Sequence, residues 1–207
     1  MQNSYKTVEK AGTGEIEEKK SRFLAEIRSV HSEEEAAAFL EEIRKKYWNA
    51  SHHCLAYRLA EGGIMRSSDD GEPGGTAGRP ILDVLTGADL YDTAAIVTRY
   101  FGGTLLGTGG LTRAYGSAAR AALESCTVIV KQRGIHLLVK TDYTVLGWLK
   151  RLESDRHLVI SGADYAETVY LDILVTAEEA ERFKQELLNE TGGKARIETG
   201  EPCWFVM

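Results

Sequence analysis

The stretch from Arg66 to Leu82, R-S-S-D-D-G-E-P-G-G-T-A-G-R-P-I-L, constrains the fold of this chain more than any other. Glycine, proline and acidic residues crowd it, and its apolar residues follow neither a helical nor a strand period, so it is predicted to be a loop. Loops of this length are uncommon inside a compact domain unless they serve a function. Because ordering one residue costs about 1–2 kcal/mol of backbone entropy, we expect its amides and carboxylates to find partners within the protein.

Several residues are expected to shape this loop, because Asp side chains accept backbone N–H groups, glycines adopt positive φ and prolines fix φ. They are Asp69, Asp70, Gly71, Glu72, Pro73, Gly74, Thr76, Gly78, Arg79 and Pro80. The three acids can also hold Mg²⁺, but acids adjacent in a turn more often bond local amides, so no metal is predicted. Arg79 either ties the loop to its own acids or faces a ligand.

A second glycine-rich stretch, G-G-T-L-L-G-T-G-G-L-T-R-A-Y, runs from Gly102 to Tyr115. It follows a strand-like run, Ala94–Phe101, and leads into an alanine-rich helix. Free N–H groups and the positive end of the dipole at a helix start favour an anion. The predicted anion-binding residues are Arg99, Gly102, Gly103, Gly107, Gly109, Gly110 and Arg113.

The alternative is that these glycines only permit a tight turn and close packing of the helix. There is no Walker-A lysine and no G-x-G-x-x-G pattern with a downstream ribose-binding acid, so no nucleotide cofactor is predicted.

The other patterns of the first 134 residues predict alternating strands and helices. A capping box, Ser32 with Glu35, precedes a helix of about four turns. Pro80 is expected to open a short helix that ends at Gly87. Strands are expected at Tyr5–Val8, within 14–30 and at Ser51–Ala60.

The strand Ser51–Ala60 carries the residues that most resemble a catalytic set, His52, His53 and Cys54. The two histidines point to opposite faces of a strand, so they cannot share one metal ion. Cys54 lies on a face of small residues and is expected to pack in the core rather than act as a nucleophile. No catalytic residue is predicted.

The last third of the chain predicts a separate domain. Residues 128–134 are expected to be a helix end and a connector, followed by a strand at Ile135–Lys140 and a helix capped by Thr141 or Asp142. A hairpin about G-A-D, a helix behind the capping box of Thr176 and Glu179, and a last strand complete the order βαββαβ, which is the ferredoxin-like plan. The predicted class is α+β, with domains at 1–134 and 135–207.

Composition limits the environment and the partners. The three cysteines are odd in number, widely separated and without a C-x-x-C pair, so neither disulfides nor zinc are predicted. No run approaches the roughly 18–20 apolar residues of a membrane span, and no apolar leader follows the first residues, so a cytoplasmic protein is expected.

The net charge of −6 argues against a simple polyanion binder, but the charge is uneven. Within residues 93–134 the bases outnumber a single acid, Glu124, which allows a local basic surface on an acidic protein. These bases are Arg99, Arg113, Arg120, Lys131 and Arg133.

Four motifs resemble the IMPACT family, in particular its bacterial YigZ-like branch. They are K-S-R-F-L-A (20–25), H-H-C-L-A-Y (52–57), S-D-D-G-E-P-G-G-T-A-G-R-P-I-L (68–82) and V-T-R-Y-F-G-G-T-L-L-G-T-G-G-L-T-R-A-Y (97–115). The resemblance covers most of residues 15–125. Gly75 departs from it, because related sequences often have Ser there, which removes a hydroxyl group.

The resemblance implies an N-terminal domain similar to domain 2 of ribosomal protein S5 and a C-terminal domain similar to the last domain, domain V, of elongation factor G. It also implies a link to translation, because eukaryotic relatives restrain a starvation-activated initiation-factor kinase by engaging its activator protein.

The favoured hypothesis is a non-catalytic, translation-associated regulatory protein that binds RNA phosphate or a ribosomal surface through its glycine-rich loops. Two alternatives stay open: a protein-interaction module whose acidic C-terminal domain docks a basic partner of the translation machinery, and an enzyme. The enzyme would act on a small phosphorylated or carboxylated substrate with Asp69, Asp70 or Glu72 as base. No cofactor is predicted for any of the three.

Overall fold

The computed structural model describes residues 3–155 and 157–206. It contains two compact units, one of residues 5–130 and one made of the described parts of 1–4 and 131–207. The division between the two units falls at 130/131, inside the long strand β7 (Thr127–Thr141). Each unit has its own sheet and is described by itself.

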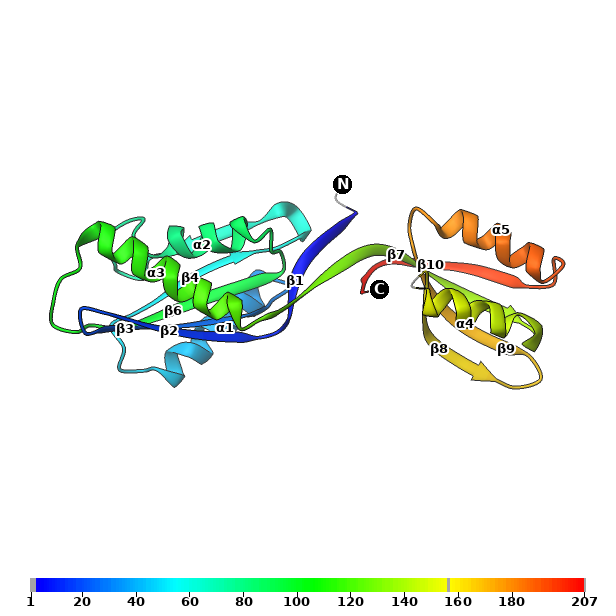
Figure 1. The fold of residues 1–207 in the computed structure, drawn as a ribbon, viewed down its shortest axis with the longest axis horizontal. Helices are drawn as coiled ribbons and strands as arrows, with labels where there is room; N and C mark the ends of the chain where they lie inside the picture. Colours follow the sequence, from blue (N-terminus) through cyan, green and yellow to red (C-terminus); the bar gives the residue numbers. More distant parts are fainter. Residues whose placement is uncertain (1–2, 156, 207) are drawn as a thin grey trace. The chain divides into compact units, whose positions relative to one another are not determined.

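The N-terminal unit is built on a five-stranded antiparallel sheet in the order β2-β3-β6-β4-β5 (Figure 1). The strands are β2 (Gly12–Glu18), β3 (Ser21–Ser29), β6 (Thr93–Tyr100), β4 (His52–Arg58) and β5 (Met65–Ser68). Helices α2 (Gly78–Gly87) and α3 (Gly107–Glu124) pack on one face, and α1 (Glu33–Lys46) packs on the other. A further strand, β1 (Ser4–Lys10), pairs with β7, and a 3₁₀ turn (Glu61–Gly63) joins β4 to β5.

Strand β4 is buried on both faces, which suits the apolar run from Cys54 to Tyr57. Cys54 and Ala56 face α2 and α3, and their small side chains allow close approach of these helices. Leu55 and Tyr57 face α1. The alternation predicted from the sequence is confirmed.

Helix α1 begins where the capping box predicts. The Ser32 hydroxyl accepts from the Glu35 N–H at 3.2 Å, and the Glu35 carboxylate accepts from the His31 N–H at 2.7 Å. The helix runs for 14 residues, about four turns.

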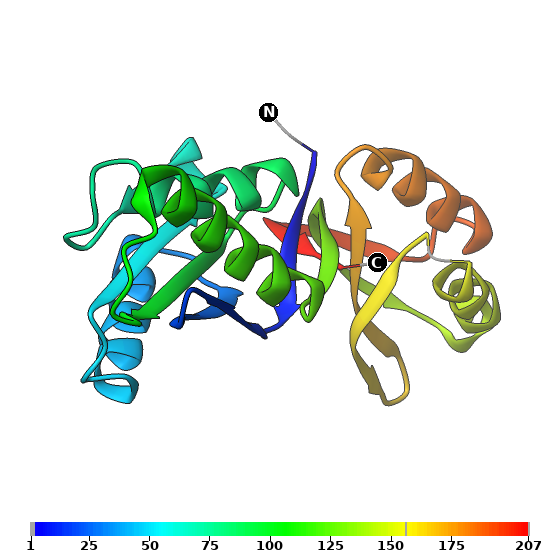
Figure 2. The same ribbon diagram turned by 60° about the vertical axis from the view of Figure 1, so that its left-hand side comes forward.

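The C-terminal unit follows the expected βαββαβ order, and its strands form the antiparallel order β10-β7-β9-β8. After β7 come a 3₁₀ turn (Tyr143–Val145), α4 (Leu146–Ser154), β8 (Val159–Tyr165), β9 (Val169–Thr176), α5 (Ala180–Glu190) and β10 (Arg196–Phe205). Both helices cover the same face of this sheet (Figure 2), with the rings of Trp148 and Phe183 stacked 6.0 Å apart between them. Asp142 caps the first turn by accepting from the Thr144 N–H at 2.9 Å.

Three local expectations are wrong. The stretch Arg66–Leu82 is not a loop throughout, because both of its ends have regular secondary structure. Met65–Ser68 pairs with β4 as an exposed edge strand, and α2 already starts at Gly78. Residues 128–134 belong to β7 rather than to a helix end, as suits the β-branched run V-I-V. The hairpin turns at residues 166–168, and G-A-D lies inside β8.

None of the helices in the described part of the chain is long and apolar enough to cross a membrane.

Candidate functional site

Asp69 holds the loop between β5 and α2 together. Its Oδ1 accepts from the N–H groups of Ala77 and Gly78 at 2.9 and 2.8 Å, and its Oδ2 accepts from that of Gly75 at 2.8 Å. Partial burial by itself would raise the pKa of Asp69, but the three donors outweigh it and lower this pKa below its ordinary value. The carboxylate therefore acts as an acceptor for the backbone that opens α2.

Asp70 fastens the same loop to α1 and β4. Its carboxylate pairs with Arg44 at 2.9 Å and accepts from the His53 N–H at 2.7 Å, and its carbonyl lies 2.8 Å from His52 Nδ1. Asp70 and Gly71 both have positive φ, so the chain reverses here.

The remaining residues of this loop also have local roles. The carbonyl of Pro73 accepts from both the N–H and the hydroxyl of Thr76, at 3.0 and 2.6 Å. A Cβ on Gly78 would lie 2.8 Å from the backbone of Ser68, so only glycine fits where α2 meets β5. Arg79 bonds Asp83 of its own helix at 2.8 Å and neither ties to a loop acid nor enters the loop.

Glu72 lies at the centre of a buried polar cluster. Its Oε1 accepts from Arg99 Nη1 at 2.6 Å and from the Tyr115 hydroxyl at 2.7 Å, and lies 3.9 Å from His52 Nε2. The Glu72 and Arg99 side chains are only 3% and 6% exposed. Arg99 Nε is fully buried and has no hydrogen-bond partner among the described residues.

This burial corrects the expectation that Arg99 meets a phosphate at the surface. Its guanidinium lies 5.5 Å from the ring centroids of both Phe23 and Phe101 and is paired with Glu72. Next to this cluster, Cys54 donates to the Asp69 carbonyl, and burial raises the pKa of the Cys54 thiol to about 12. Cys54 is a core residue, as predicted.

A cavity of about 480 Å³ opens above this cluster, between the two glycine-rich loops. We refer to it as the loop cavity. Its polar lining comes from Ser51, His52, Glu72, Arg99 and the start of α3 at Gly107 and Thr108. Its apolar lining consists of Pro73, Phe101, Leu105, Leu106 and Leu111, of which Phe101 and Leu105 are 50% and 82% exposed.

The second glycine-rich loop is shorter than expected, because α3 already begins at Gly107. A Cβ on Gly102 would overlap the backbone of Lys20, and Gly103 and Gly107 have positive φ. Gly109 and Gly110 lie in the first turn of α3, where Gly110 packs closely on Leu106. The helix has no side-chain cap at its N-terminus.

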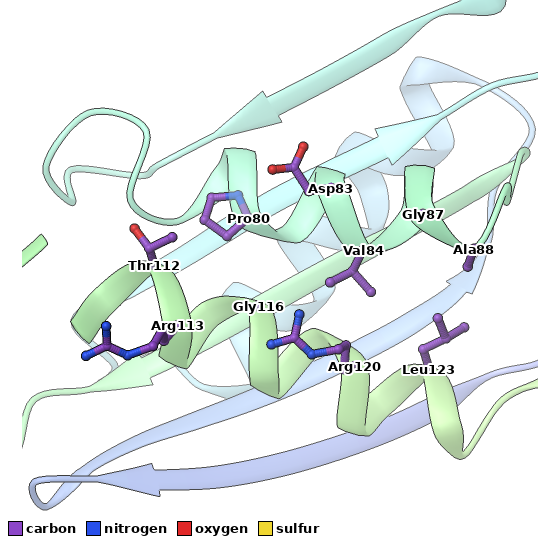
Figure 3. A pocket seen from close by; sticks show the side chains of 10 residues that line it. All are labelled: Pro80, Asp83, Val84, Gly87, Ala88, Thr112, Arg113, Gly116, Arg120 and Leu123. Atoms are coloured by element: carbon purple, nitrogen blue, oxygen red, sulfur yellow. The ribbon is translucent and has the colours of Figure 1, made fainter. Parts of the chain in front are cut away.

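A second cavity, of about 570 Å³, lies between α2 and α3 and is shown in Figure 3. We refer to it as the α2–α3 groove. Its floor consists of small and apolar residues, including Pro80, Val84, Ala88 and Leu123. Arg113 and Arg120 line its α3 side, and both side chains extend towards the N-terminal end of the helix.

The two arginines occupy equivalent places on α3. A glycine stands four residues before each, so the guanidinium of Arg113 lies over Gly109 and that of Arg120 over Gly116. Arg120 bonds the Ser117 hydroxyl at 3.2 Å, and within the described residues neither arginine has an ion pair. The groove therefore presents two cations that can bind an anion, and the carboxylate that lines its α2 side, Asp83, is paired with Arg79.

Those sequence-predicted residues that line a cavity separate into two places. Glu72, Pro73, Arg99 and Gly107 line the loop cavity, whereas Arg113 lines the α2–α3 groove with Pro80. From the sequence alone, Arg120 is named only as one of the bases of residues 93–134, and His52 only as part of a catalytic set that is rejected. The repeated spacing of Gly109 to Arg113 and Gly116 to Arg120 identifies the first, but no local pattern separates His52 from an ordinary strand residue.

No group of three or more His, Cys, Asp and Glu side chains in the described parts of the chain is arranged to hold a metal ion.

These features define a class of protein with two units of mixed helix and strand. In the first unit, a loop held by acidic side chains lies next to the glycine-rich start of a helix. A family model for the Impact N-terminal domain matches residues 19–123, and a model for a domain of unknown function (DUF1949) matches residues 139–194. The chain belongs to the IMPACT family, as its motifs predict.

Bacterial members of the family match most of its length. The chain is 40% identical over 202 residues to IMPACT family member YvyE of Bacillus subtilis (strain 168), covering 97% of this chain and 93% of that protein. It is 34% identical over 182 residues to IMPACT family member YigZ of Escherichia coli (strain K12), covering 86% and 89%. A solved structure described as a hypothetical protein is 33% identical, with a TM-score of 0.65 over 97% of this chain and 99% of that chain.

Proposed function

We propose that this protein is a non-catalytic, translation-associated regulatory protein whose N-terminal unit binds RNA phosphate, free or on a ribosomal surface. The translation role is what membership in the IMPACT family implies. The observation that carries the binding role is the pair Arg113 and Arg120, which line one groove without an ion pair among the described residues. Arginine is well suited to phosphate, because its planar guanidinium donates two parallel hydrogen bonds.

The proposal also assigns the two units. Residues 1–134 are an IMPACT-type domain with the fold of ribosomal protein S5 domain 2, and residues 135–207 are a ferredoxin-like domain similar to domain V of elongation factor G. The order β10-β7-β9-β8, with both helices on one face, supports the second assignment.

The two arginines of the groove favour RNA binding over the alternative function, in which a basic protein partner docks on the acidic C-terminal unit. On α5 the acids are partly neutralised by their own neighbours, since Arg182 bonds Glu186 at 3.0 Å and Lys184 bonds Glu181 at 2.7 Å.

The loop acids are also poorly suited to act as a catalytic base. The carboxylate of Asp69 is occupied by three N–H donors, that of Asp70 by Arg44 and His53, and Oε1 of Glu72 by Arg99 and Tyr115. Asp69 and Asp70 use both carboxylate oxygens in these bonds, whereas Glu72 uses one and is ion-paired with buried Arg99. A general base needs a lone pair that reaches the proton of its substrate.

Binding of a fluorescent oligouridylate across a salt series, together with ribosome co-sedimentation, tests the proposal. Each phosphate contact on single-stranded RNA contributes about −0.7 to the slope of log K against log salt. The double variant Arg113→Ala/Arg120→Ala should therefore bind more weakly and with a slope smaller by about 1.4.

Arg182→Ala is the matched control, because it removes an exposed, ion-paired helical arginine from the other unit. It should leave both affinity and slope unchanged. Salt-independent binding, or equal slopes for wild type and the double variant, would refute the proposed contact.

A further inference from the structure

The loop cavity has no lining residue in common with the α2–α3 groove, so its role is separate from the phosphate contact proposed above. Its volume of about 480 Å³ lies in the range of small-molecule sites, which are mostly apolar with a few fixed polar groups. Pro73, Phe101, Leu105 and Leu106 form the apolar wall, and Glu72 with His52 lies at its polar end.

The polar end presents hydrogen-bond acceptors that lack donors. Both close donors to Glu72, from Arg99 and Tyr115, reach Oε1, and within the described residues Oε2 has no partner. The Asp70 carbonyl can only accept, so His52 Nδ1 carries a proton, and Nε2 is an acceptor in the tautomer that has its single proton on Nδ1. Nε2 lies 3.9 Å from Glu72 Oε1, too far for a hydrogen bond between them.

The groups at this polar end are held in place by hydrogen bonds within the protein. Glu72 is held by two side chains from β6 and α3, and His52 is held by the backbone of the acidic loop. The charge of Glu72 is balanced by buried Arg99. The hydrogen-bond donor of a ligand at this cluster can therefore be neutral or cationic. A hydroxyl or an ammonium group meets this requirement.

Another part of the cavity lining, at Gly107 and Thr108, favours negative charge. Gly107 and Thr108 begin α3, where the first N–H groups have no intrahelical acceptor and no side chain caps them. A buried Glu72 with an unpartnered oxygen and an uncapped helix start thus line the same cavity.

We propose that the loop cavity binds a small organic acid that carries a hydroxyl or ammonium donor. A hydroxyl donates its single O–H to His52 Nε2, whereas an ammonium group can donate to both His52 Nε2 and Glu72 Oε2. The carboxylate lies at the start of α3, and the carbon skeleton contacts Phe101 and Leu105.

The test is a titration of the full-length protein with small acids. Binding is monitored through the amide resonances of Gly107 and Thr108 in ¹H–¹⁵N spectra. The probes are 3-hydroxybutanoate, 5-hydroxypentanoate and 4-hydroxyphenylacetate, each paired with the same acid without its hydroxyl. At least one hydroxy acid should shift these resonances and bind about tenfold more tightly than its partner, because it alone supplies the donor. 4-Methylphenol, which lacks a carboxylate, should bind more weakly than 4-hydroxyphenylacetate.

Two variants test the donor-binding part and the carboxylate-binding part of the proposed site, and both keep the Glu72–Arg99 ion pair. His52→Phe should abolish the preference for hydroxy acids while binding of the acids without a hydroxyl persists. Thr108→Glu places a competing charge at the helix start, which stabilises the helix, and should weaken every acid about tenfold or more. The same spectra report whether each variant is folded.

The proposal is overturned if no hydroxy acid shifts the cavity resonances, if each pair of acids binds equally, or if His52→Phe keeps the preference. The Arg113→Ala/Arg120→Ala variant should bind these acids like wild type, so failure here and failure of the RNA contact are distinguishable.

Discussion

At the scale of single residues, Asp69 has the largest share of loop hydrogen bonds. Asp69→Asn removes the charge and one acceptor oxygen facing three N–H donors, so it should lower the free energy of unfolding by about 2–3 kcal/mol at neutral pH. Because the pKa of Asp69 is lower in the folded state, its stabilisation is present above the unfolded pKa and is lost as the pH falls through the folded value. Urea unfolding at pH 7 and at pH 3 measures the difference.

Asp83→Asn is the control, because Asp83 makes an exposed ion pair within α2. It should cost under about 0.5 kcal/mol. A variant of Asp69 that is as stable as wild type at pH 7 would show that the loop does not depend on this carboxylate.

The buried pair of Arg99 and Glu72 gives a second prediction for single residues. Arg99→Met leaves the Glu72 carboxylate buried without its cation and should cost about 3–5 kcal/mol. The double variant Arg99→Met/Glu72→Leu removes both charges and should cost less than Arg99→Met alone. A urea double-mutant cycle checks this, and purely additive costs would contradict it.

At the scale of elements, glycine serves different purposes in different helices and loops. Gly102→Ala should lower stability by more than about 3 kcal/mol, because the added Cβ overlaps the backbone of Lys20, which no side-chain movement can relieve. Gly147 lies inside α4 with open space around it, so Gly147→Ala should raise stability by about 0.5–1 kcal/mol. Thermal midpoints of the two variants compare them directly, and shifts in the same direction would contradict the structure.

The helices and strands also show which sequence patterns are enough to predict secondary structure. Helices α1 and α5 follow capping boxes and periodic apolar faces, and both occur where these predict. Strand β5 has no apolar period because all its residues are exposed at a sheet edge, and only its pairing with Leu55–Arg58 makes it a strand. Strand β7 follows closely after the end of α3, so the local sequence pattern predicted a helix end and a connector where the first half of the strand lies.

At the scale of the whole molecule, each unit has a hydrophobic core of its own. Leu85 is fully buried in the N-terminal core and Leu149 in the C-terminal one. Urea unfolding should therefore show two transitions, and each change to alanine should weaken one of them by about 2–5 kcal/mol. Tryptophan fluorescence can follow the C-terminal transition, because Trp148 packs against that core. A single transition lowered equally by both changes would show that the units unfold together.

The sequence by itself determined the family, the mixed α/β class and most elements, because these depend on local apolar period, capping residues and long glycine-rich motifs. It also placed Cys54 in the core, since strand alternation is local. Only the tertiary structure decided that Arg99 pairs with Glu72 under a cavity while Arg113 and Arg120 share a groove. Whether an arginine is buried or free depends on which distant carboxylate reaches it, and that is a property of the packed chain.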